Sequence, residues 1–177
     1  NFDGNHFGFL TYASNEVVRQ QFLGGGAYRY YDSDAHKFDG NAYLKAARHL
    51  GEQWDVFADV QYRYVGYKTD GYNDKYKTDK ATGEILTHYL DINEKYHFFN
   101  PKAGFSWHTG GHRVYGSVAL SHREPERNNF TDNGHRAYPK AERLTDYELG
   151  YTYNSGIFRA GANFFYMDYT DQFVQTG

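Results

Sequence analysis

Residues 53–68 read QWDVFADVQYRYVGYK, and along this stretch apolar and polar side chains alternate. The even positions from Trp54 to Tyr64 are apolar or aromatic, and the odd positions are mostly Asp, Gln or Arg, with Phe57 as the main exception. A period of two is typical of a β-strand with one face in an apolar medium. The stretch therefore predicts an extended strand with two chemically different faces.

Five further stretches alternate in the same way, at residues 38–49, 99–108, 113–121, 146–154 and 158–167. The connectors between the six stretches are alternately short (50–52, 109–112, 154–156) and long (69–94, 123–141). Each short connector has the Gly or Asn that a tight hairpin turn favours. If successive strands are antiparallel neighbours, all short turns lie at one end and all long loops at the other, as in outer-membrane barrels. The predicted fold is all-β, an antiparallel up-and-down transmembrane β-barrel segment.

Composition agrees with strands joined by turns, because 20% of the 177 residues are aromatic and the chain has 19 Gly but 3 Pro. A net charge of −3 gives no reason to expect a nucleic-acid partner. The chain has no Cys, which excludes disulfides and thiol chemistry. No apolar run reaches the roughly 18 residues of a spanning helix, and a mean hydropathy of −0.86 does not test spanning strands.

Aromatic residues recur at a fixed spacing of eight along three of the predicted apolar faces. Eight extended residues, tilted by roughly 40°, cover about 20 Å along the membrane normal, close to the ~25 Å apolar band of such barrels. The alternative is a soluble β-sandwich, but the long strands and the small residues at their centres favour a membrane wall. The predicted membrane girdle consists of Trp54, Tyr62, Phe99, Trp107, Phe158 and Tyr166.

The opposite faces carry charged and amide side chains that we expect to face the lumen or a plug. Such a wet polar interface would let a plug rearrange, and a role in passage of a ligand is the alternative. No nucleophile, phosphate-binding Gly loop or metal triad accompanies the paired carboxylates, so the chain is not predicted to be an enzyme. The predicted lumen-facing residues are Asp55, Asp59, Arg63, Asp146, Glu148, Arg159 and Asn163.

Two long connectors hold candidate ligand-binding residues. Arg123, Arg127 and Asn128 follow a strand end, where guanidinium groups would hold a carboxylate or catecholate. The alternative is that the two arginines pair with Glu124, Glu126 or acidic residues of the lumen and order the loop. Tyr72 and Tyr76 offer flat rings for a sugar, porphyrin or corrin. The nine His lack the spacing of a metal or haem site, so no metal and no cofactor are predicted.

Several segments resemble those of TonB-dependent outer-membrane receptors, especially the receptors of Bacteroidetes-type bacteria. The resemblance lies in residues 59–63 (DVQYR), 100–104 (NPKAG), 112–115 (HRVY), 123–129 (REPERNN) and 142–151 (ERLTDYELGY). It implies a barrel of about 22 strands with a plugged lumen. The chain 1–177 would then be a partial barrel domain from its C-terminal half, with 1–36 mainly an extracellular loop and 37–170 forming six strands. The plug, the TonB-contacting segment and the terminal strand would lie outside it.

The resemblance also implies a function and a set of partners. The protein would lie in the cell outer membrane, surrounded by its lipid, and would import a scarce small-molecule or oligosaccharide nutrient. The candidates are an iron–siderophore complex, haem, cobalamin or a glycan. Energy would come from a TonB-type protein acting through the plug. The alternatives are a soluble or surface β-domain that binds glycans through exposed Tyr, and a passive porin or adhesin barrel.

Overall fold

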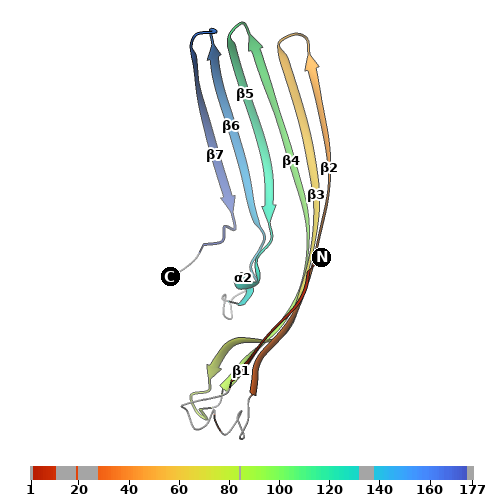
Figure 1. The fold of residues 1–177 in the computed structure, drawn as a ribbon, viewed down its shortest axis with the longest axis vertical. Coiled ribbons are helices and arrows are strands. Elements are labelled where there is room, and N and C mark those ends of the chain that lie inside the picture. The colour runs from red at the N-terminus through yellow and green to blue at the C-terminus, as the bar shows by residue number, and fades with distance from the viewer. Residues whose placement is uncertain (1, 11–18, 20–27, 84, 132–137, 175–177) are drawn as a thin grey trace. The chain divides into compact units, whose positions relative to one another are not determined.

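A computed structural model describes residues 2–10, 19, 28–83, 85–131 and 138–174. The strands form one sheet in which neighbours in the sequence are neighbours in space, in the order β1 to β7 (Figure 1). This confirms the predicted antiparallel up-and-down sheet. The strands are β1 (Phe2–Leu10), β2 (Tyr28–Leu50), β3 (Trp54–Thr78), β4 (Ile85–Thr109), β5 (His112–Arg123), β6 (Glu142–Asn154) and β7 (Arg159–Thr170), and a short helix α2 spans Arg127–Thr131.

The chain divides into two compact units, which are described separately. The first unit is drawn from Asn1–Asp39, Val65–Lys95 and Thr131–His135. The second unit is drawn from Gly40–Tyr64, Tyr96–Phe130 and Arg136–Gly177. Strands β2, β3 and β4 contribute residues to both units, whereas β5, β6 and β7 belong to the second unit.

In the second unit, the three predicted short turns lie at the same end of the strands (Figure 1). Their glycines have positive φ angles of 68° at Gly51, 53° at Gly110 and 86° at Gly156. A Cβ at any of these three glycines would meet nothing within 4 Å, so the backbone angle, and not the available space, requires glycine. The sequence therefore predicted these turns for the correct physical reason.

Strands β3 and β4 are longer than we predicted. The residues predicted as a long loop, 69–94, mostly continue β3 and β4, and the turn begins at Asp79. Asp79 Oδ1 accepts hydrogen bonds from the backbone N–H groups of Ala81 (2.7 Å) and Thr82 (3.1 Å). These backbone donors hold the pKa of the Asp79 carboxyl below its ordinary value. A polar segment forms a hairpin here because ladder pairing satisfies its backbone groups without needing an apolar face.

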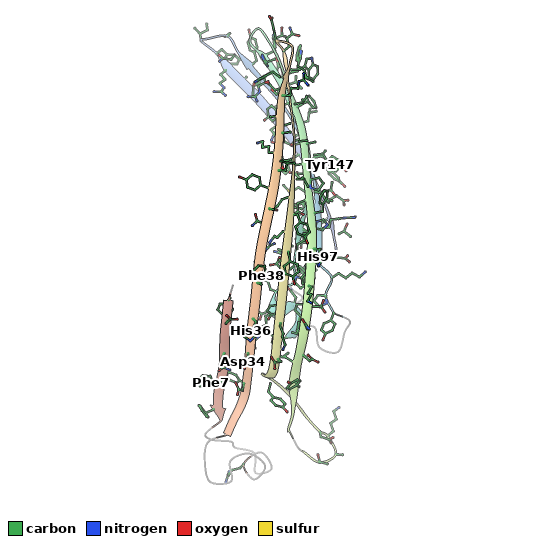
Figure 2. The ribbon with its side chains drawn as sticks, turned by 90° about the vertical axis from the view of Figure 1, so that its right-hand side faces the viewer. Phe7, Asp34, His36, Phe38, His97 and Tyr147 are labelled. Atoms are coloured by element: carbon green, nitrogen blue, oxygen red, sulfur yellow. The ribbon has the colours of Figure 1, made fainter. Side chains whose placement is uncertain are left out.

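The first unit also contains a hairpin where we predicted mainly an extracellular loop, in residues 1–36. Strand β1 pairs with β2 from Phe2↔Lys37 to Leu10↔Tyr28, with a register shift between Gly8 and Phe9. Polar contacts join the two strands: Asn5 donates to Asp34 Oδ1 at 2.7 Å, and His36 contacts Asp3 (Figure 2).

Buried side chains are few, because a single sheet leaves both faces accessible. Among the described residues, the buried apolar side chains are Val65, Leu90 and Ile92 in the first unit and Phe98 and Phe130 in the second. Within the described part of the chain, no helix is long and apolar enough to cross a membrane.

Candidate functional site

The register of β4 to β7 aligns apolar side chains and glycine in rows on one side of the second unit. One such row joins Phe105, Gly116, Leu149 and Phe164, and the next joins Ala103, Val118, Tyr147 and Tyr166. We call this side the apolar face; Tyr147 marks it in Figure 2. Its side chains are unusually exposed for apolar groups, with Phe164 71% and Tyr166 65% accessible. An apolar surface of this extent is typical of a contact with lipid or with another protein.

The predicted girdle residues lie on this apolar face in two groups. Near the short turns, the Trp54 ring lies 6.4 Å from Trp107 and 5.9 Å from Phe105, measured between ring centroids. Farther along the strands, the Tyr62 hydroxyl is 2.7 Å from Nδ1 of His97. Tyr166 lies 6.2 Å from Tyr147, and Phe99 and Phe158 are exposed. The structure thus brings Trp54 and Trp107 into contact. Tyr62, Phe99 and Tyr166 lie on the same side of the sheet, and Phe158 lies in the turn before β7.

The opposite, polar face carries the residues predicted to face the lumen. One row joins Gly104, Ser117, Glu148 and Phe165, and the next joins Lys102, Ala119, Asp146 and Met167. Asn163 donates a hydrogen bond to Glu148 at 2.8 Å, which links β7 to β6. Asp146 Oδ1 is buried without a hydrogen-bond partner among the described residues. Arg159 is exposed opposite Asn154 at the start of β7.

Two further lumen predictions, Asp55 and Asp59, lie on β3 near the short turns. Asp55 contacts His49, and its other oxygen is 3.8 Å from Nδ1 of His108. Asp59 lines a shallow hollow of about 400 Å³ together with Lys45 and Lys102. Among the described residues, no group of three or more His, Asp or Glu side chains is arranged to hold a metal ion.

Arg63, the last of the predicted lumen residues, binds the connection between β5 and β6. Its two terminal nitrogens donate to the two carboxylate oxygens of Glu124, at 2.9 and 3.1 Å. The side chains are largely shielded, with 24% of Arg63 and 11% of Glu124 accessible. A bidentate pair of this kind fixes both distance and orientation. It therefore ties the start of the connection to β3.

The candidate ligand residues in that connection have different surroundings. Arg123 donates to Glu142 at 3.4 Å, and its guanidinium lies 5.2 Å from the centroid of the Phe173 ring. Glu142 also accepts from the backbone N–H of Phe173 at 3.0 Å. Arg127 and Asn128 lie in α2, where Asn128 is exposed and Arg127 is half-buried. Arg123 thus has an acidic partner, but that partner is Glu142, which we did not consider from the sequence.

The two candidate tyrosines belong to the first unit. Tyr72 is exposed and makes an edge-to-face contact with Tyr89, with ring centroids 5.1 Å apart. The backbone of Tyr76 lies in β3, and its side chain is outside the described part of the structure.

Sequence reasoning missed a cluster on the polar face, which we call the basic hollow. It has a volume of about 460 Å³ and is lined by Lys45, Arg48, Lys102 and Arg113, with the rings of Phe57 and Tyr115. The ammonium groups of Lys45 and Lys102 lie 5.5 and 6.0 Å from the centroid of the Phe57 ring. The available signal was Phe57 itself, an aromatic residue that interrupts the polar side of β3 between Asp55 and Asp59.

Comparison with known proteins places this geometry in a family. The family described as "TonB dependent receptor-like, beta-barrel" matches residues 1–177. No curated protein matched the sequence. Among solved structures, the ferric-catecholate import receptor Fiu from E. coli K12, in its closed form, is similar in fold with a TM-score of 0.61 and 18% sequence identity. The match covers 82% of this chain and 23% of that chain.

Members of this family lie in the outer membrane of Gram-negative bacteria and are transporters, not enzymes. The antiparallel sheet with two chemically different faces is consistent with the family match along residues 1–177. This chain is a barrel segment that belongs to the TonB-dependent receptor β-barrel family and is located in the outer membrane.

Proposed function

We propose that this chain forms part of the wall of an outer-membrane importer that takes up a scarce nutrient by TonB-dependent active transport. The observation that carries the proposal is the separation of the second unit into an exposed apolar face and a polar face. In a closed barrel, the first face contacts lipid and the second lines the interior. The predicted lumen residues from Asp55 to Asn163 would then contact a plug, whose displacement is driven by a TonB-type protein.

Within the second unit, the proposed ligand-binding residues are Arg127 and Asn128 of α2, which supply guanidinium and amide groups. Tyr72, on the part of β3 that belongs to the first unit, is proposed separately as an exposed aromatic contact. Tyr76 stays a prediction from the sequence. Arg123 fits a structural role better, because Glu142 and the Phe173 ring already engage its guanidinium. The Arg63–Glu124 pair supports the proposal by fixing the position from which α2 starts.

The proposed ligand classes are an iron–siderophore complex, haem, cobalamin or a glycan. The similarity in fold to a receptor for ferric catecholates supports the first of these. At 18% identity this similarity concerns the fold alone, and growth on each nutrient source distinguishes the four classes.

The test deletes the full-length gene and measures growth on single sources of iron, haem, cobalamin or glycan. We expect growth to fail on one source and to be restored by the intact gene. Restoration should also require a functional TonB and a proton-motive force, because a passive porin needs neither. Undiminished growth on all sources, or rescue that is independent of TonB, would contradict the proposal.

A further inference from the structure

The polar face of the second unit concentrates positive charge beside the short turns. Lys45 on β2 and Lys102 on β4 lie against the same ring, Phe57 of β3, at 5.5 and 6.0 Å. Arg113 on β5 lies 5.7 Å from the centroid of its neighbour Tyr115 on the same face. Four consecutive strands, β2 to β5, thus contribute cations and rings to the basic hollow.

Two glycines leave room for the rings of Phe57 and Tyr115 on the adjacent strands. A Cβ at Gly104 would come within 2.6 Å of Cε1 of Phe57, and a Cβ at Gly150 within 2.0 Å of Cζ of Tyr115. Each ring therefore occupies space that a side chain on the adjacent strand would fill. The cationic groups lie over these rings and border open space instead of being packed into a core.

The carboxylates that line the same hollow have other partners. Asp55 contacts His49, and Glu148 accepts a hydrogen bond from Asn163 at 2.8 Å. Arg113 donates through Nε to Ser106 Oγ at 2.8 Å, a neutral acceptor. Within the part of the chain that the structure describes, neither Lys45 nor Lys102 forms an ion pair with a carboxylate. Lys45, Lys102 and Arg113 outnumber the two carboxylates that line the hollow, and Asp59 borders the adjoining hollow beside both lysines.

The two lysines also border the adjoining hollow of about 400 Å³. Cavities that bind small molecules typically measure about 300–1,000 Å³ and combine apolar walls with a few polar groups. The basic hollow is within that range, and its walls include the two rings, Ser106 and Ser117. Lysine ammoniums attract oxyanions as point charges, and the guanidinium of Arg113 offers further donors.

We propose that the basic hollow is a binding site for a small anionic ligand whose carboxylate, phosphate or catecholate oxygens bridge Lys45 and Lys102. The proposal rests on the proposed import function and adds a charge class to the cargo. The ligand would occupy this site on the wall after leaving the outer loops, on the side of the short turns.

The test uses the full-length protein, with any other cysteine replaced by serine, and Ser117→Cys carrying an environment-sensitive fluorophore, because Ser117 lines the hollow. The probes are inorganic pyrophosphate and the ferric complex of 2,3-dihydroxybenzoate. We expect a saturable fluorescence change that weakens with added salt. The double variant Lys45→Gln/Lys102→Gln should bind about ten- to a hundredfold more weakly, because two charge-assisted contacts are lost.

Lys140→Gln is the matched control, since it removes one exposed lysine near the opposite end of β6 and should leave the response unchanged. Circular dichroism of each variant would establish that the barrel is folded. The absence of a saturable response to both probes, or an equal response in the double variant, would overturn the proposal. The proposal would also be overturned if the fluorophore reacts with the Ser117→Cys thiol only in the double variant. That result would indicate that an acidic stretch of the same protein fills the hollow.

The two proposals fail separately. If the gene is needed for growth on one nutrient but neither probe binds in the basic hollow, the import function stands and the anion site is rejected. If a probe binds in a lysine-dependent way but deleting the gene impairs growth on none of the nutrients, the anion site stands and the import function is rejected.

Discussion

At the scale of single residues, the polar face is organised by contacts between distant positions. Arg63 and Glu124 form a bidentate pair with 24% and 11% of their side chains accessible. A shielded pair is less screened than a surface ion pair, so losing one partner leaves the other poorly solvated. Phe57 likewise depends on Gly104, which leaves room for its ring. Both contacts give testable consequences.

Glu124→Gln is expected to destabilise the protein by about 1–3 kcal/mol, because Arg63 loses its charge-assisted partner. Arg63→Gln should cost a similar amount, and the two changes together should cost less than their sum. Urea unfolding of the full-length protein in detergent measures all three. Glu126→Gln, an exposed change two residues away, should stay within about 0.5 kcal/mol. Strictly additive effects of the two substitutions would show that the pair is not coupled.

At the scale of elements, the sheet depends on turns that need positive φ and on rings that need space on the next strand. Gly51, Gly110 and Gly156 are open to solvent but conformationally constrained. Gly104 shows the opposite requirement, because a Cβ there would overlap the Phe57 ring. Strands β3 and β4 also extend to Thr78 and from Ile85, through residues without a continuous apolar face. Ladder pairing alone is sufficient to continue them.

Gly104→Ala is expected to destabilise the barrel by about 1–3 kcal/mol, because the added methyl group overpacks the contact with Phe57. In a Phe57→Leu background, the same substitution should cost less, since the aromatic ring is gone, but it should not become neutral, because the Cβ would still lie 2.7 Å from the backbone oxygen of Gly116. Denaturant unfolding of the four proteins of this cycle provides the measurement. If Gly104→Ala costs the same with and without the Phe57 ring, the close approach of the Gly116 backbone oxygen, and not the ring, explains the glycine.

At the scale of the molecule, this chain is a segment of a family barrel, and its match covers 23% of the solved receptor Fiu. The sheet ends at β7, which is bonded to β6 on one side and exposes both of its faces. In a closed barrel, strands on either side would pair with such edges. The assignment of one face to lipid is therefore a property of the assembled barrel, and substitutions on the two faces should differ in their cost.

Val60→Arg, on the apolar side of β3, is expected to cost about 2–4 kcal/mol in a lipid bilayer, because a charge would face the hydrocarbon. Gln61→Arg on the polar side should be much milder, although it removes the 3.1 Å hydrogen bond from Asn100. Unfolding of the full-length protein from lipid vesicles compares the two. Equal costs at positions 60 and 61 would contradict the assigned facing.

The sequence alone determined the features that depend on local spacing. Alternation with a period of two predicted the strands from residue 37 to 170 and their two faces, and the glycines predicted the three short turns. These predictions succeed because side-chain direction and turn angles depend on adjacent residues. The resemblance in segments such as 123–129 led to the family that the comparison confirmed.

Only the tertiary structure decided which distant residues meet. Glu124 pairs with Arg63, 61 positions away, while Arg123 pairs with Glu142. Likewise, Phe57 lies over Gly104 between Lys45 and Lys102, although in the sequence it is only an exception to the alternation. The reason is physical: alternation fixes the face on which a side chain lies, whereas its neighbours across the sheet depend on the register between strands, which the pairing of the whole sheet sets.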